Sequence, residues 1–92
     1  MTADVKEARR LQLIAARRTL GEMWGLDRPL FAAELGRALR LGGRDPGESI
    51  RDYERGTTTI SGPISVALDM MLAGAPPPDP LDVILGPRGG QA

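Results

Sequence analysis

Residues 45–56 read Asp45-Pro46-Gly47-Glu48-Ser49-Ile50-Arg51-Asp52-Tyr53-Glu54-Arg55-Gly56, and this stretch decides the fold. Asp45 offers a side-chain acceptor for the N-cap of a helix, and Pro46 suits the first helical position because the N–H it lacks would have no partner there. Glu48 follows the cap by three residues and completes a capping box. Gly56 favours the left-handed conformation that ends a helix. We therefore expect a short helix over 46–55 that needs support from its neighbours.

The composition points to helices and away from catalysis. The 92 residues include no cysteine, no histidine and one each of Phe, Trp and Tyr. Disulfides, thiol chemistry and the commonest general base and metal ligand are therefore missing. A core of Leu, Ile, Met and Ala suits helix-on-helix packing. We expect one all-α domain that is not an enzyme and has no cofactor and no metal site.

The charges balance overall. Twelve basic and twelve acidic residues cancel, which argues against nucleic-acid binding through bulk charge. All but one of the bases are arginine, which favours directed contacts to phosphate, carboxylate or guanine. No apolar run is long enough to span a membrane, and the start of the chain is charged, so we expect a cytoplasmic protein with no membrane partner.

Apolar periodicity places three further helices around residues 46–55. The first is expected from Ala3 to about Trp24, with Val5, Leu13, Ala16, Leu20, Met23 and Trp24 on its packing face. The second is expected from Pro29 to about Leu41, ended by Gly42 and Gly43, with Glu34, Arg37 and Arg40 left for solvent or a partner. A fourth helix is expected from about Pro63 to Ala73.

A proline-rich stretch divides the end of the chain from these helices. We expect a helical domain over 1–74 and, over 75–92, a linker followed by a short apolar tail. The tail carries Leu81, Ile84 and Leu85 after a possible helix start at Asp79-Pro80. It either folds back over the core or offers an apolar patch to another protein.

The run from Ser49 to Gly56 resembles the Ser-hydrophobic-x-x-aromatic-Glu-x-Gly signature of the Cro/CI-type (XRE) helix-turn-helix family of DNA-binding proteins. Leu35 to Leu39 resembles the first helix of that motif, and Pro63 to Leu72 resembles the helix after the recognition helix. The resemblance covers residues 15–72. It implies a lambda-repressor-like domain of four to five short helices that inserts helix 46–55 into the major groove.

The resemblance also implies site residues. Gly47, Glu48, Ser49 and Asp52 match the positions that touch bases or nearby phosphates. Glu54 matches a glutamate that pairs with an arginine of the first helix, for which Arg17 is the first candidate and Arg18 the second. Because carboxylates are repelled by phosphates, we expect arginines and hydroxyls to carry most of the contact. The predicted DNA-binding set is Arg44, Gly47, Glu48, Ser49, Arg51, Asp52, Arg55, Thr57, Thr58 and Thr59.

Two classes of function follow from these patterns. The first is a sequence-specific regulator of transcription, bacterial or phage, that binds double-stranded DNA as a homodimer. Arg51 and Arg55 favour it, because no acidic residue lies between them on their row of the helix. The second is a helical adaptor or assembly protein, resembling a small terminase or an antitoxin, that keeps the fold and binds a protein partner through Leu81, Ile84 and Leu85. The neutral charge and the acidic positions on helix 46–55 favour this alternative.

Overall fold

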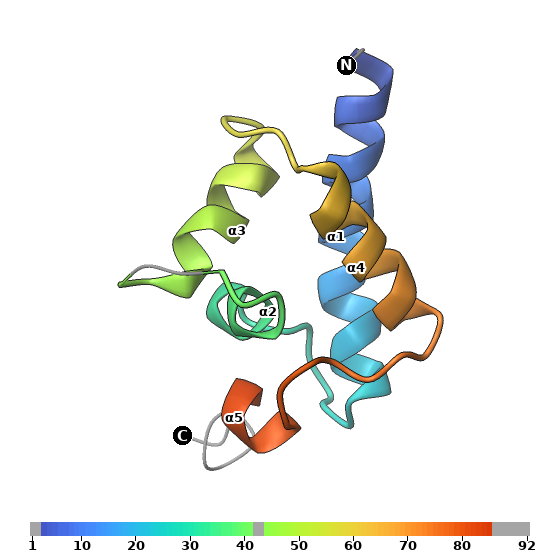
Figure 1. Cartoon of the computed structure of the whole chain (residues 1–92), viewed down its shortest axis with the longest axis vertical. Coiled ribbons are helices and arrows are strands. Elements are labelled where there is room, and N and C mark those ends of the chain that lie inside the picture. The colour runs from blue at the N-terminus through green and yellow to red at the C-terminus, as the bar shows by residue number, and fades with distance from the viewer. Residues whose placement is uncertain (1–2, 42–43, 86–92) are drawn as a thin grey trace.

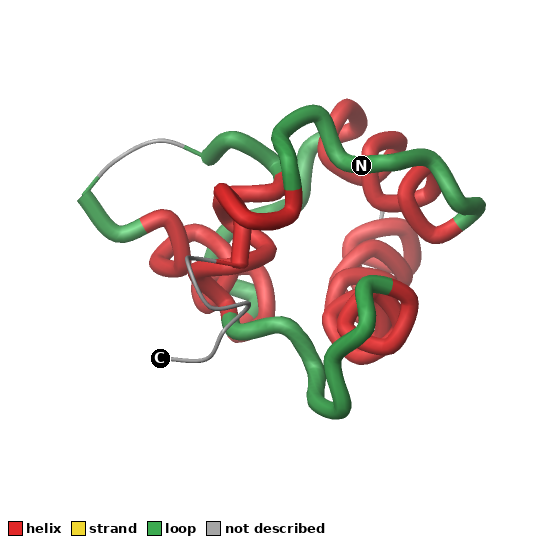
Figure 2. The backbone as a smooth tube through the Cα atoms, turned by 90° about the horizontal axis from the view of Figure 1, so that it is seen from below, coloured by secondary structure: helices red, strands yellow, loops and turns green. Residues whose placement is uncertain are grey.

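The computed structural model describes residues 3–41 and 44–85, which form five helices and no strand (Figures 1 and 2). The all-α prediction is therefore confirmed. The helices are α1 (Ala3–Met23), α2 (Ala32–Ala38), α3 (Pro46–Arg55), α4 (Gly62–Leu72) and α5 (Leu81–Leu85).

The helices pack around one apolar core. α1 and α4 lie side by side, α2 and α3 form a second pair, α3 also contacts α1, and α5 packs on α2 (Figure 1). Side chains from all five helices reach the centre, where Leu13, Leu20, Leu30, Leu35, Ile50, Leu68 and Ile84 are fully buried. Val5 and Met23, predicted on the packing face of the first helix, are 41% and 45% exposed and lie near the two ends of α1.

The second helix is shorter at both ends than predicted. The Leu30 N–H donates to the Arg17 carbonyl over 2.9 Å, so the chain runs extended along α1 before α2 begins at Ala32. Arg40 has a φ of +55°, and the Leu41 N–H donates to the Gly36 carbonyl over 2.9 Å. This left-handed turn ends α2 before Gly42 and Gly43, which lie outside the described residues.

Glu34, predicted to face solvent or a partner, is 2% exposed. Its carboxylate accepts from two nitrogens of Arg28, over 2.9 and 3.0 Å, and from the Phe31 N–H over 2.7 Å. Burial raises the pKa of the Glu34 carboxyl, but these donors outweigh burial and leave the pKa below its ordinary value. The prediction is wrong because the loop before α2 carries Arg28 over the start of the helix.

The last described helix, α5, folds back onto the core, which is one of the two alternatives predicted for the apolar tail. Ile84 and Leu85 are buried, and Arg37 Nε donates to the Ile84 carbonyl over 2.7 Å. Arg40 and Asp79 form an ion pair of 2.7 Å between the turn after α2 and the proline-rich segment. Ile84 and Leu85 therefore belong to the core and are unavailable to a partner, which corrects their assignment as partner-binding residues. Leu81 remains exposed.

Candidate functional site

The candidate site is built on α3, whose bounds agree with the predicted helix. Asp45 is its N-cap and accepts the Gly47 N–H over 3.0 Å, and Gly56 ends it with a φ of +80°. The capping box predicted for Glu48 is wrong: its carboxylate is exposed and bonds to none of the described residues. A hydrogen bond of this kind, from the N–H of the cap residue to a glutamate at the third helical position, occurs instead in α2, where the Phe31 N–H donates to Glu34.

Two glycines allow α2 and α3 to approach closely. A Cβ atom on Gly36 would lie 2.1 Å from the Pro46 carbonyl oxygen, and one on Gly47 would lie 2.8 Å from the Ala33 nitrogen. Both positions therefore exclude a side chain. Gly47, predicted to contact DNA, is buried against α2.

An ion pair fixes α3 against α1. Arg17 Nη1 donates to both carboxylate oxygens of Glu54, over 2.9 and 2.7 Å, and the two side chains are 25% and 21% exposed. Arg17 Nε also donates to the Leu30 carbonyl over 2.9 Å, so one guanidinium joins α1, α3 and the loop before α2. The predicted pair is confirmed with Arg17, while Arg18 is exposed. Such a pair adds little net stability but fixes the position of α3 on α1.

The face of α3 opposite these contacts is polar. Glu48, Arg51 and Arg55 are exposed, Ser49 and Asp52 are half-buried, and Arg44 is exposed just before the helix. The predicted set, apart from Gly47, therefore lies on or beside the surface of one helix.

Acidic residues pair with both arginines of this face. Arg51 forms an ion pair with Asp45, and Arg55 forms one with Asp52. The hydrogen bond from Arg51 holds the pKa of the Asp45 carboxyl below its ordinary value, with help from the Gly47 N–H. No acidic residue lies between Arg51 and Arg55 on their row of the helix, as predicted, but each still has an acidic partner, because Asp45 reaches Arg51 from the cap and Asp52 reaches Arg55 across one turn. The face is close to neutral as a result.

The loop after α3 carries the predicted threonines. Thr57, Thr58 and Thr59 are exposed, and the Thr57 hydroxyl donates to the Asp52 carbonyl over 3.1 Å. The buried Ile60 ends the loop, and its carbonyl accepts from Arg9 of α1 over 3.1 Å. The loop therefore presents its hydroxyls from a backbone that is held at both ends.

A pocket that was not predicted from the sequence lies between the start of α1 and the end of α3, and we call it the α1–α3 pocket. It has a volume of about 450 Å³ and is lined by Lys6, Glu7, Arg10, Tyr53, Arg55, Gly56, Thr58 and Ile60. Its residues come from segments more than forty positions apart, so no local spacing could reveal it. Among the described residues, no group of three acidic side chains lies close enough to hold a metal ion, and no helix is long and apolar enough to cross a membrane.

Comparisons of the chain with models of protein families, with curated proteins and with solved structures find no match. The described residues define a small all-α protein in which a polar helix is held against two others and keeps one face open.

Proposed function

We propose that the protein binds double-stranded DNA by inserting α3 into the major groove, with α2 and α3 acting as a helix-turn-helix unit. The observation that carries the proposal is the way α3 is held. Gly36 and Gly47 bring it against α2, and the Arg17–Glu54 ion pair fixes it on α1, while its polar face stays open. A helix that reads base edges needs this combination of a fixed position and exposed polar side chains.

The ion pairs on α3 are compatible with DNA contact. Each arginine uses one terminal nitrogen for its aspartate, and a guanidinium has five N–H donors. Exposed ion pairs of this kind contribute about 0–1 kcal/mol, which is less than a bidentate contact to guanine is worth. Arg51 and Arg55 can therefore be held in position before binding and still donate to DNA.

Glu48 is better suited to recognising particular bases than to raising the affinity for DNA of any sequence. Its carboxylate is exposed and repels phosphates, but it can accept a hydrogen bond from the amino group of cytosine. An acidic group at the start of α3 would thus lower binding to random sequence and favour sites that place cytosine opposite it.

We further propose that two copies bind a two-fold symmetric site as a homodimer and regulate transcription. One α3 reaches only a few base pairs, so a second copy is the simplest way to gain specificity.

The decisive experiment is a titration of fluorescent duplex DNA fragments at two salt concentrations. We expect affinity to fall steeply with salt, and Arg51→Ala and Arg55→Ala to weaken it further. Arg40→Ala is the matched control, because Arg40 is an exposed arginine outside α3 and, like Arg51 and Arg55, forms an ion pair with an aspartate. If the wild-type protein binds no duplex at low salt, the proposal is wrong.

One observation favours the alternative, a protein-binding adaptor. Val66 and Met70 lie one turn apart on α4, and each is 57% exposed. Exposed apolar side chains that are neighbours on one helix face can form part of a contact surface for another protein. An interaction with a protein partner that does not depend on salt and is abolished by Met70→Asp would favour this function over DNA binding.

A further inference from the structure

The α1–α3 pocket is lined by a buried tyrosine whose hydroxyl lacks a partner among the described residues. Tyr53 is 9% exposed, and its hydroxyl bonds to none of the residues that the structure describes. Buried tyrosine hydroxyls usually have a hydrogen-bond partner, because an unpaired polar group costs free energy. The Tyr53 ring packs in the core, and the residue also lines the pocket. The pocket therefore offers an unused donor.

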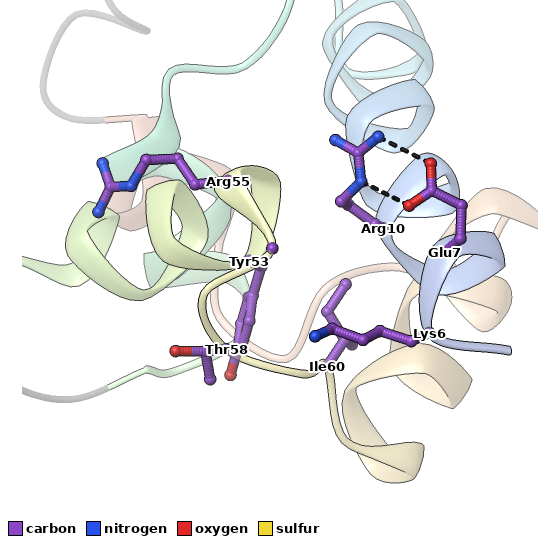
Figure 3. Close-up of a pocket in the computed structure, with 8 residues that line it drawn as sticks. Lys6, Glu7, Arg10, Tyr53, Arg55, Thr58 and Ile60 are labelled. Atoms are coloured by element: carbon purple, nitrogen blue, oxygen red, sulfur yellow. Dashed lines mark hydrogen bonds and ion pairs between the residues drawn. The ribbon is translucent and has the colours of Figure 1, made fainter. Parts of the chain in front are cut away.

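A positively charged side chain, that of Lys6, also lines the pocket. Figure 3 shows the side chain of Lys6 extending from α1 toward Tyr53 and Thr58, whereas the guanidinium of Arg55 points away from α1. No carboxylate among the described residues pairs with Lys6. Its ammonium is therefore available to a ligand.

The other charges at the pocket are already paired. Arg10 binds the Glu7 carboxylate through two nitrogens, over 3.0 and 2.8 Å, and donates to the Glu54 carbonyl over 3.0 Å. The hydrogen bond from Arg10 lowers the pKa of Glu7, so this carboxylate stays ionised and neutralises Arg10 at neutral pH. Arg55 is paired with Asp52, so Lys6 is the one lining charge among the described residues without a partner, and it gives the pocket a net positive charge.

The pocket continues the open face of α3. Arg55 belongs to both, and Thr58 lies in the loop proposed to meet the DNA backbone. A phosphate group accepts several hydrogen bonds and carries negative charge. The pocket offers it two hydroxyls and one ammonium, from Tyr53, Thr58 and Lys6.

We propose that the α1–α3 pocket binds one backbone phosphate of the DNA that α3 reads, with Lys6 and Tyr53 as the contacting residues. This inference rests on the proposed DNA binding. If the proposal is right, the first two turns of α1 help to position the duplex beyond the end of α3. They do so by contacting the DNA backbone, which carries no sequence information.

Two variants test the pocket by duplex titration over a range of salt concentrations. Tyr53→Phe removes the hydroxyl and keeps the buried ring, and we expect affinity to fall about tenfold, as for the loss of a hydrogen bond to a charged group. Lys6→Gln should lower affinity for all sequences alike and reduce the salt slope by about one, while Lys6→Arg should restore it. Arg18→Gln removes the same charge from α1 outside the pocket and should leave the slope unchanged.

Unfolding curves separate a binding role from a structural one. Because the Tyr53 hydroxyl has no partner among the described residues, Tyr53→Phe should unfold at the same temperature as the wild type or at a slightly higher one. A clear loss of stability would mean that the hydroxyl is bonded within the protein, and this would overturn the proposal.

The outcomes for the pocket and for DNA binding are distinguishable. If the wild type binds duplex and both variants bind equally well, the pocket assignment is wrong and the role of α3 stands. If the wild type binds no duplex, both proposals are wrong. If inorganic phosphate alone shifts the amide resonances of Gly56 and Thr58 while Lys6→Gln leaves duplex affinity unchanged, the pocket takes free phosphate and the assignment to DNA is overturned.

Discussion

Replacing Gly36 with alanine tests whether the close approach of α2 and α3 is essential to the fold. The new Cβ would lie 2.1 Å from the Pro46 carbonyl oxygen and 2.6 Å from its carbon, whereas ordinary contact begins at 3.4 Å. Both atoms belong to the backbone, so no side chain can rotate away. The two helices must separate by more than 1 Å, and the packing around Leu35 and Ile50 must open with them.

The expected cost follows from two opposing effects. Overpacking of this kind lowers the free energy of unfolding by about 1–3 kcal/mol or more. Alanine raises it by up to about 1 kcal/mol, because alanine is a better helix former than glycine. We expect a net loss of about 2 kcal/mol, which lowers the melting temperature of a domain of this size by about 10 °C.

Gly62→Ala is the matched control. Gly62 begins α4, and a Cβ atom there would meet nothing within 4 Å. This substitution should raise stability by about 0.5 kcal/mol, because it restricts the unfolded chain.

Thermal and urea unfolding can be followed by far-ultraviolet circular dichroism and by the fluorescence of Trp24, which packs against the core. If Gly36→Ala melts at or above the wild-type temperature while Gly62→Ala behaves as expected, the argument that glycine sets the spacing of α2 and α3 is refuted.

Three further substitutions address the buried carboxylate, the last helix and the open face of α3. Glu34→Gln should lose about 1–3 kcal/mol at neutral pH, because the amide cannot replace the carboxylate that Arg28 pairs with. Since the pKa of Glu34 is lower in the folded protein than its ordinary value of 4.5, the stability it adds is present above that value and is lost as the pH falls through the folded pKa. Urea unfolding at a series of pH values should therefore show a weaker loss in acid for Glu34→Gln than for the wild type, and equal losses would contradict this role. Ile84→Ala should cost about 2–5 kcal/mol, because Ile84 is fully buried, whereas the exposed Val83→Ala should change stability by less than about 0.5 kcal/mol. Equal melting temperatures for these two variants would place α5 outside the cooperative fold. Glu48→Gln should bind random-sequence duplex about two- to fivefold more tightly in a polarisation assay, because one carboxylate no longer repels phosphates, and weaker binding would exclude that repulsion.

Local signals in the sequence predicted α3 well. Its cap, its proline and its terminal glycine act within a few residues, so their effect does not depend on the rest of the chain. The start of α2 was predicted poorly because a distant contact decides it, and its end was predicted poorly because Arg40 adopts a left-handed conformation that is uncommon for arginine. The bond between Leu30 and the Arg17 carbonyl holds the chain extended before α2, and no pattern within residues 29–41 reports it.

Parts of the candidate site could likewise be predicted from the sequence, and other parts could not. Glu54 was predicted to pair with an arginine of the first helix from the resemblance of residues 49–56 to a helix-turn-helix signature, and Arg17 was the first of two candidates for that arginine. The pairing of Arg51 with Asp45 could not be predicted from helix spacing, since Asp45 lies at the cap and reaches a residue six positions later. The α1–α3 pocket depends on how far α1 extends past the end of α3, which is a property of the packed structure.

Arg17 also limits how the sequence can diverge. Its guanidinium donates to the Glu54 carboxylate and to the Leu30 carbonyl, which lie in different directions and on segments that are far apart in the sequence. Lysine carries a single ammonium on a flexible stem and cannot make both contacts in the same directions. We therefore expect homologues that keep glutamate at position 54 to keep arginine at position 17. Lineages that lose one of the two should change the other and the loop before α2 as well, so that three distant segments evolve as a unit.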